Sequence, residues 1–405
     1  MTTAPSDPSV IDGGLTCYVD ELVAWRRHLH QYPELSFAEH ETVAYIEAQL
    51  RRRLAHATFR NLTPTSLVVT LDTGRPGPKL GLRADIDALP VQEDQPNLDF
   101  ASTVPGRMHA CGHDAHTATV MAAIAWADDH LDSLTGEIHA IFQHAEELPP
   151  GGAKEMVETG YFTGFDFIYG FHYFSTLPTG TVDIKDGPAS SNSDLFTITL
   201  TGLGGHASMP AATIDPVVAA AALVTQLQTI VSRRVDAGVP VVVSTTYLAA
   251  GTDEALNVIP GVAKVGGSVR TQSEESRELV QRSMREFLAG LEASNPGMKA
   301  ELDYLVGYDG VWNDPVRTQR VRELAQARWG ERVVAEPAML GGEDFSAFSR
   351  VAPATYVFVG SGSEGKPYTT ASHHSSGFGL DEDSFPIGLA LAVDVIINGP
   401  AITRP

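Results

Sequence analysis

The side chains best suited to chemistry lie in a nine-residue segment from Met108 to His116. This segment holds one thiol, three imidazoles and one carboxylate, and it runs directly into an apolar stretch. Cys111 and His113 flank a single glycine, so a thiolate and an imidazole can reach one metal ion, and both groups are preferred zinc ligands. The alternative is a helix N-cap at Asp114 with incidental histidines. The crowding of ligand side chains favours a metal site.

A pair of carboxylates, Glu146 and Glu147, follows an apolar run that ends at Phe142 and precedes a turn that begins at Leu148. Ligands and bases in open α/β sheets gather at the carboxyl ends of strands. Successive side chains of an extended segment point in opposite directions, so one carboxylate could bind metal while the other acts on water as a general base. A solvated acidic pair is the alternative, and the apolar strand before it favours function.

Two further histidine segments could complete such a site. His172 ends another predicted strand, and the pair His373-His374 lies in a serine-rich loop. A lone histidine in a strand is more often a core residue. The four segments together, however, supply candidate ligands from well-separated parts of the chain, as a site at the carboxyl edge of a sheet requires.

The apolar pattern predicts the elements that must position these residues. Strands are expected at 66–71, 79–89, 137–142, 165–174 and 354–359, and helices at 16–32, 39–54, 117–127, 152–158, 314–328 and 385–397. This alternation predicts an α/β fold with a mixed central sheet flanked by helices. Between residues 194 and 306 the order becomes β-α-β-β-α-β, which is typical of a ferredoxin-like unit. We therefore expect a metal-binding catalytic domain at 1–188 and 307–405, and an inserted domain at 189–306.

Bulk properties narrow the class of protein. A chain of 405 residues exceeds the size of one ordinary hydrophobic core, which favours two domains. A net charge of −22 without clustered Lys and Arg argues against nucleic acid as a partner. The apolar segments are too short for a membrane span, no signal-peptide pattern opens the chain, and Cys17 and Cys111 lie in unlike surroundings, so we expect a cytoplasmic protein without a disulfide.

Several motifs together resemble one known family. They are HQYPEL (His30–Leu35), RADIDALP (Arg83–Pro90), MHACGH (Met108–His113), Phe142–Glu147, GGH (Gly204–His206), NVIP (Asn257–Pro260), GEDF (Gly342–Phe345) and His373-His374. The sequence resembles the amidohydrolase branch of the zinc aminoacylase and carboxypeptidase family. That group includes hippurate hydrolase, indole-acetyl amino acid hydrolases and N-acetyl-diaminopimelate deacetylase.

The resemblance implies two divalent metal ions, zinc ahead of manganese, cobalt or nickel. It implies the ligand set Cys111, His113, Glu147, His172 and His374, with Glu146 as general base. It also implies that the smaller domain acts as a lid through which a homodimer forms, that His206 completes the active site of the partner subunit, and that Asn257 and Arg270 bind the free carboxylate of the substrate. The choice of His374 over His373 rests on its spacing to Phe378.

Ligating histidines usually donate their second N–H to an acceptor, so Asp87 and Asp114 are expected either in that role or as turn and cap residues. His116 receives no role. His144 and the Leu148-Pro149-Pro150 loop depart from the family pattern and leave the acyl group and the amino acid open.

These assignments predict a hydrolase that cleaves the amide bond of an N-acyl amino acid to a carboxylic acid and a free amino acid. Three alternatives remain. The first is a metallo-carboxypeptidase or dipeptidase that acts on peptides. The second is an enzyme in which Cys111 is a nucleophile with a histidine base, and the third is a metal-binding or scaffold protein without catalysis.

Overall fold

The structure, a computed structural model, describes residues 14–95 and 98–404 and divides into two compact units. The first comprises the described residues within Met1–Ala189, Val311–Pro337 and Asp344–Pro405, and the second comprises Ser190–Gly310 and Ala338–Glu343. The sequence placed 338–343 with the catalytic domain. In the structure this segment belongs to the second unit, where the N–H of Ser191 donates to the carbonyl of Gly341 at 3.1 Å.

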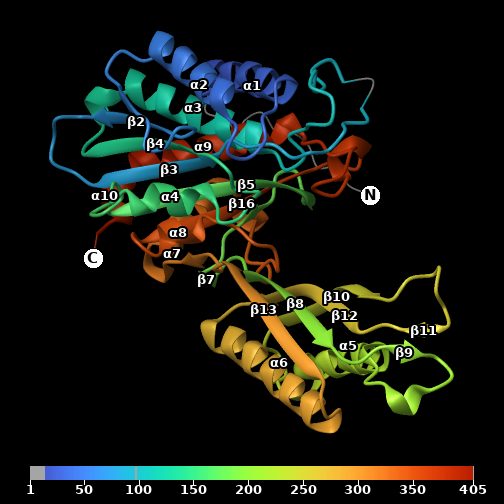
Figure 1. Cartoon of the computed structure of the whole chain (residues 1–405). Coiled ribbons are helices and arrows are strands. Elements are labelled where there is room, and N and C mark those ends of the chain that lie inside the picture. The colour runs from blue at the N-terminus through green and yellow to red at the C-terminus, as the bar shows by residue number, and fades with distance from the viewer. Residues whose placement is uncertain (1–13, 96–97, 405) are drawn as a thin grey trace. The chain divides into compact units, whose positions relative to one another are not determined.

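The first unit is built on an eight-stranded mixed sheet with the order β1-β2-β4-β3-β5-β16-β6-β15 (Figure 1). Its strands are β1 (Thr58–Arg60), β2 (Leu67–Asp72), β3 (Lys79–Asp85), β4 (Glu137–Gln143), β5 (Phe167–Pro178), β6 (Val182–Asp183), β15 (Val333–Val334) and β16 (Ala354–Gly362). The adjacent strands β4, β3, β5 and β16 run parallel, so their carboxyl ends meet at one edge. The predicted mixed central sheet is confirmed. Strand β3 ends at Asp85, before the predicted end at 89.

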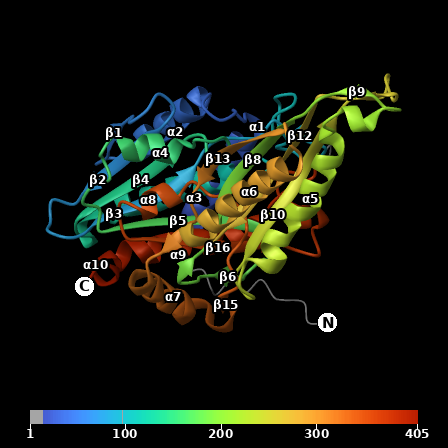
Figure 2. The same cartoon turned by 60° about the horizontal axis from the view of Figure 1, so that its bottom comes forward.

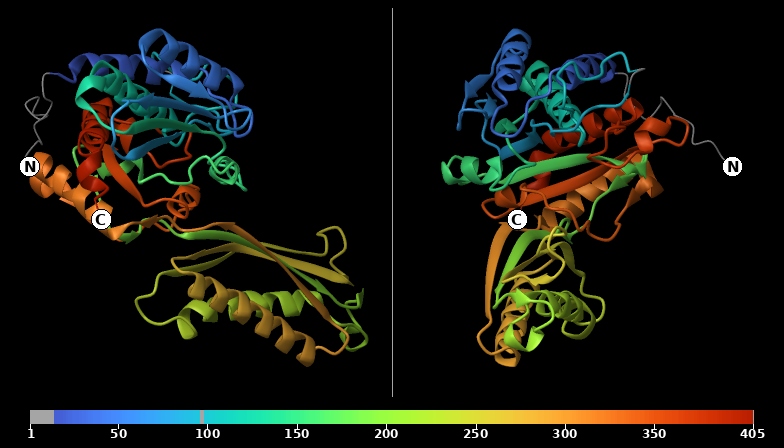
Figure 3. Two further views of the ribbon diagram at one scale, coloured as in Figure 1. Left: turned by 90° about the vertical axis from the view of Figure 1, so that its left-hand side faces the viewer. Right: turned by 45° about the vertical axis from the view of Figure 1, so that its right-hand side comes forward.

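Helices flank this sheet, as predicted. They are α1 (Thr16–Gln31), α2 (His40–Arg53), α3 (His113–Asp129), α4 (Gly152–Glu158), α7 (Pro315–Trp329), α8 (Ser346–Ser349), α9 (Phe385–Ile397) and α10 (Gly399–Ile402). The helices α1, α2 and α3 lie on one side of the sheet and α4 and α8 on the other (Figure 1). The two further views in Figure 3 show the same layers, with the blue N-terminal helices on one side. Among the described residues, no helix combines the length and the apolar character needed to cross a bilayer.

Helix α3 carries the cysteine and histidine motif into the core. It is rich in alanine and is buried along almost its whole length, which fits a helix that is apolar on every side. The helix begins at His113, four residues before the predicted start, and its N-cap position is Gly112 without a side-chain cap. The reading of Asp114 as an N-cap is therefore wrong. Gly112 has φ +98°, a conformation in which other residues are strained, and a Cβ there would lie 2.9 Å from a methyl group of Leu380, so glycine is favoured.

The second unit is a four-stranded antiparallel sheet in the order β10-β12-β8-β13 with two helices (Figure 2). Its main elements are β8 (Asn192–Thr201), α5 (Pro216–Arg233), β10 (Val241–Ala250), β12 (Val262–Thr271), α6 (Glu274–Ser294) and β13 (Lys299–Tyr308). Alternate residues of β8 are buried, and Phe196, Ile198 and Leu200 pack in one core with apolar residues of both helices. A separate two-stranded pair joins β9 (Gly205–His206) to β11 (Val258–Ile259).

Candidate metal centre

Residues from distant parts of the chain meet beside the carboxyl ends of the parallel strands. Cys111 precedes α3, His113 opens it, Glu146 and Glu147 follow β4, His172 lies within β5, and His374 lies in the loop after β16. Each of these elements is fixed by the buried sheet, which lets side chains far apart in sequence share one location.

The five predicted ligands form two groups that share Cys111. One group is Cys111, His113 and His172, the other is Cys111, Glu147 and His374, and within each group the ligand atoms lie within 4.8 Å of one another. The Sγ of Cys111 is 3.4 Å from Nε2 of His172, and Nε2 of His374 is 3.2 Å from Oε1 of Glu147. Nε2 of His113 lies 3.9 Å from the same Glu147 oxygen, which joins the two groups. The structure therefore brings all five side chains together.

Two buried polar atoms at this point make no hydrogen bond to any described residue, Nε2 of His113 and Oε1 of Glu147; the nearest nitrogen to the latter, Nε2 of His374 at 3.2 Å, belongs to a predicted ligand. His113 uses its other ring nitrogen, because Nδ1 donates to the backbone carbonyl of Asp87 at 3.0 Å and lies 3.2 Å from its carboxylate. His172 likewise directs Nδ1 to the carbonyl of Tyr173 at 2.6 Å, which leaves Nε2 facing Cys111. Buried polar atoms normally have partners, so the two bare atoms fit a bound cation. The set of sulfur, nitrogen and oxygen donors suits zinc and its neighbours.

The charge around these atoms also favours a cation. Burial opposes protonation of His113, but the carboxylates of Asp85 and Asp87 outweigh it and raise its pKa to about 10. Burial, followed by the charges of Glu147 and Glu146, raises the pKa of Cys111 well above its usual value. A nucleophilic cysteine needs a lowered pKa. The surroundings of Cys111 therefore argue against the cysteine-nucleophile alternative and for a thiol that ionises on a metal.

The structure also separates the adjacent histidines of the last motif. Nε2 of His373 accepts the backbone N–H of Ser175 at 3.1 Å, and Nδ1 lies 3.7 Å from Sγ of Cys111. Burial, with a smaller effect of His374, lowers the pKa of His373 to about 3, so its ring is neutral and Nδ1 carries the proton. Both nitrogens of His373 are thus engaged, whereas Nε2 of His374 faces Glu147. This geometry supports the choice of His374 as the ligand.

Comparison with known proteins identifies the family. The family described as Peptidase family M20/M25/M40 matches residues 81–398. The chain belongs to this family. The N-acetylcysteine deacetylase of Bacillus subtilis is 37% identical over 366 residues, which cover 90% of this chain and 93% of that protein. The N-acyl-L-amino acid amidohydrolase of Geobacillus stearothermophilus is 43% identical over 294 residues, 72% of this chain and 78% of that protein.

A solved structure agrees with these sequence relatives. It is a dinuclear metal binding peptidase of the M20 family from Bacillus subtilis, with a TM-score of 0.79 and 34% identity, and the match covers 94% of this chain and 99% of that chain. The resemblance inferred from the motifs is therefore confirmed, and the chain is a hydrolase of the M20 family.

Two buried residues without a predicted role support the centre of this M20 hydrolase. Nδ1 of His116 donates to Oδ1 of Asp85 at 2.7 Å, and its Nε2 accepts the backbone N–H of Tyr173 at 3.0 Å. Because Tyr173 follows His172, this pair fixes the strand that carries a predicted ligand. The sequence signal for Asp85 is the alternation in RADID, since every second residue of a strand shares one face.

Asp114 has different partners from those expected. Its Oδ2 lies 2.8 Å from Nδ1 of His30 and 2.9 Å from Nε of Arg26, and all three side chains are buried. Burial opposes ionisation of Asp114, but Arg26 and His30 outweigh it and hold the pKa of this carboxyl well below its usual range. The structure thus joins Asp114 to the HQYPEL motif instead of to a ligand imidazole.

The site residues that the sequence predicted in the second unit lie at two separate positions. His206 and Asn257 are exposed and near each other, because β9 pairs with β11 and the N–H of Ala207 donates to the carbonyl of Asn257 at 3.0 Å. Arg270 is half-buried at the other end of β12, eight residues beyond Val262, or about 26 Å along the strand. Within one unit, Asn257 and Arg270 therefore do not lie together around one carboxylate.

His144, which departs from the family pattern, and a surface pocket both lie apart from the five predicted ligands. His144 is buried, with Nε2 3.1 Å from Glu155 and Nδ1 3.4 Å from Thr63, so it supports the loop after β4.

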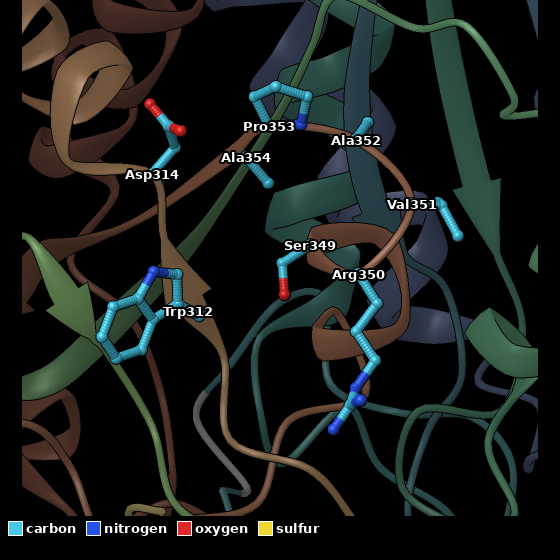
Figure 4. Close-up of a pocket in the computed structure, with 8 residues that line it drawn as sticks. All are labelled: Trp312, Asp314, Ser349, Arg350, Val351, Ala352, Pro353 and Ala354. Atoms are coloured by element: carbon cyan, nitrogen blue, oxygen red, sulfur yellow. The ribbon is translucent and has the colours of Figure 1, made fainter.

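A separate pocket of about 330 Å³ lies in the first unit (Figure 4). It is lined by Trp312, Asp314, Ser349, Arg350, Val351, Ala352, Pro353 and Ala354, and none of the predicted site residues is among them.

Replacing Cys111 with serine should remove a donor that both ligand groups share. A serine hydroxyl stays protonated near neutral pH, so we expect metal per chain, measured by plasma mass spectrometry after dialysis, to fall together with activity. Cys17→Ser is the matched control, because Cys17 is exposed and should keep full metal content. Unchanged metal in the Cys111→Ser variant would contradict the shared-ligand geometry.

The two adjacent histidines should respond differently to substitution. His374→Gln should lose one of two bound ions, because its Nε2 faces Glu147. His373→Gln should keep both ions and lose at most about 10- to 100-fold in metal affinity, as expected for a neighbour of a ligand. Metal titration of the apo proteins measures both. The reverse order would show that His373 is the ligand.

Proposed function

We propose that this M20 hydrolase cleaves the amide bond of N-acyl amino acids, releasing a carboxylic acid and a free amino acid. The observation that carries the proposal is the meeting of Cys111 with four other metal-binding side chains, with Glu146 beside them. The names of the deacetylase and amidohydrolase relatives support this substrate class. Small N-acyl amino acids in the cytoplasm are the proposed substrates.

The five ligands would hold two divalent ions, zinc ahead of manganese, cobalt or nickel. Such ions, when bound, polarise a carbonyl and make water acidic enough to ionise near neutral pH. The donor set itself is compatible with each of these metals. Cys111 would be a ligand in both groups, because each of them includes its sulfur.

Glu146 is the proposed general base. Its carboxylate is buried, 7% exposed, and Oε2 lies 3.9 Å from Nε2 of His113. Glu146 takes a proton from the attacking water as the water oxygen bonds to the amide carbon. It then gives that proton to the leaving nitrogen as the carbon–nitrogen bond breaks. The neighbouring Glu147 remains a ligand, so the two carboxylates have different tasks.

Residues of the second unit are proposed to act on the substrate. We propose that this unit is a ferredoxin-like lid, as its β-α-β-β-α-β order supports, and that a homodimer forms through it. His206 would stabilise the developing oxyanion in the site of the partner subunit, with Asn257 close to it. Arg270 would hold the free carboxylate, because a guanidinium can donate two parallel N–H bonds to the two oxygens of a carboxylate. The separation along β12 supports different tasks for Asn257 and Arg270.

Removing the base without removing the metal tests this mechanism. Glu146→Gln should keep both ions and lower kcat by about 10²- to 10⁴-fold, the usual contribution of a positioned acid–base group. Steady-state kinetics with metal analysis on the same samples measures both effects. A Glu146→Gln variant with wild-type turnover would sink the proposal.

A substrate panel separates the proposed activity from peptide cleavage. N-acetyl and N-benzoyl amino acids should be hydrolysed with higher kcat/KM than dipeptides of the same leaving amino acid, and release of the amino acid should stop on treatment with a chelator. Faster cleavage of the dipeptides would favour the carboxypeptidase or dipeptidase alternative. Activity that survives complete metal removal would contradict both.

A further inference from the structure

Backbone strain in the described residues gathers at the candidate centre. Three non-glycine residues have positive φ, Phe37 at 65°, Ala145 at 50° and His374 at 65°. Side chains with a Cβ disfavour this left-handed region, and such residues persist only where their surroundings hold them. His374 is a proposed ligand and Ala145 directly precedes the proposed base. The third residue, Phe37, lies far away in sequence, just after the HQYPEL motif.

The backbone N–H groups of Phe37 and Ala145 donate to the same carboxylate oxygen. Oε1 of Glu39 accepts the N–H of Ala145 at 2.8 Å and the N–H of Phe37 at 3.0 Å. Glu39 is fully buried, and burial followed by the charge of Asp87 raises its pKa to about 7. A buried carboxyl group is costly, but here it satisfies two strained backbone donors.

The turn that carries Glu146 is also fixed on its other side. Oδ2 of Asp87 accepts the N–H of Glu147 at 3.0 Å and the hydroxyl of Ser36 at 2.7 Å. The carbonyl of Ala145 accepts the N–H of Gly152 at 3.1 Å. The backbone on both sides of Glu146 is therefore pinned by groups from segments distant in sequence.

We propose that Glu39 is a positioning residue for the general base: by holding the Ala145 N–H, its carboxyl group keeps that residue left-handed and aims Glu146. This inference rests on the proposed role of Glu146. Without the acceptor, Ala145 would relax toward negative φ, and rotation about its backbone would displace the side chain that follows it. A displacement of about 1 Å can cost about 10²-fold in rate.

The nearby Glu34 offers a matched control. Its carboxylate accepts the N–H and the hydroxyl of Thr42, at 2.8 and 2.9 Å, and so supports the first turn of α2. Glu34 and Glu39 thus belong to the same segment, but only Glu39 bonds to the turn that carries Glu146. Loss of Glu34 perturbs the segment and leaves the acceptor of the Ala145 N–H in place.

The test compares Glu39→Met, Glu39→Gln and Glu34→Met. Methionine keeps an unbranched side chain of similar length at position 39 without a carboxyl oxygen, so kcat should fall about 10²-fold, with metal content retained and KM changed by less than about threefold. Glutamine keeps an amide oxygen for the two N–H groups and should hold kcat within about threefold of wild type, and so should Glu34→Met. The substrate is the N-acetyl or N-benzoyl amino acid that the panel shows is cleaved fastest.

Hydrogen exchange of the metal-free protein supplies a readout independent of catalysis. The Ala145 amide should be protected in wild type and in Glu39→Gln, and should exchange at least about 10-fold faster in Glu39→Met. A wild-type kcat in Glu39→Met would overturn the inference. An unprotected Ala145 amide in the wild-type protein would also overturn it, and that measurement is possible even if Glu39→Met does not fold. Failure of the Glu146 assignment would appear separately, as turnover in Glu146→Gln with the Ala145 amide still protected.

Discussion

The structure of the site depends on one electrostatic constraint: a group of acids and a thiol is buried around His113 and requires positive charge. The carboxylates of Asp85, Asp87, Glu146 and Glu147 all act on this imidazole or on the adjacent thiol. Burying several negative groups together is unfavourable unless cations or proton donors compensate them. Much of the surrounding network can be understood as that compensation.

Hydrogen bonds from the protein itself compensate only some of these buried acids. His116 serves Asp85, and the backbone N–H of Glu147 serves Asp87, so these acids are held by the chain itself. The inner atoms, Nε2 of His113 and Oε1 of Glu147, make no hydrogen bond within the described part of the chain, and the nitrogen of His374 that lies 3.2 Å from the Glu147 oxygen is itself a proposed ligand atom. The chain thus satisfies the outer atoms, fixes the orientation of the inner ones, and leaves them directed at one location. That arrangement is what metal binding requires of a protein scaffold.

Backbone conformation sets the directions of these side chains. Gly112 is left-handed between Cys111 and the first residue of α3, and Ala145 is left-handed before the base. Glycine adopts this conformation freely, whereas alanine needs an external partner, which Glu39 provides. The segment that follows HQYPEL carries none of the proposed ligands, yet it is connected to the chemistry through the hydrogen bond that the N–H of Ala145 donates to Glu39. Strain near a site is tolerated because the surrounding core over-determines the conformation.

Several properties followed from the sequence itself, because they depend on local pattern. Residue type and spacing predicted the segments that carry candidate ligands, since Cys111 and His113 precede an apolar helix and the Glu146-Glu147 pair follows an apolar strand, and the family resemblance then implied which of these residues are ligands. The same periodicity predicted most strands and helices of the mixed sheet within a few residues. It missed the start of α3, because the ligand-bearing residues before Thr117 are polar in sequence but buried in the fold.

Other properties were decided only by the tertiary structure, because they depend on contacts between distant segments. Only the folded structure shows that both ring nitrogens of His373 have partners, because Ser175 and Cys111 are distant from it in sequence. The partners of Asp114 come from α1, the role of His116 depends on β3 and β5, and the separation of Asn257 from Arg270 depends on the direction of β12. The sequence therefore determined which side chains could bind metal. The tertiary structure decided which of their atoms remain free to do so, because the hydrogen-bond partners of each side chain are set only when distant segments pack together.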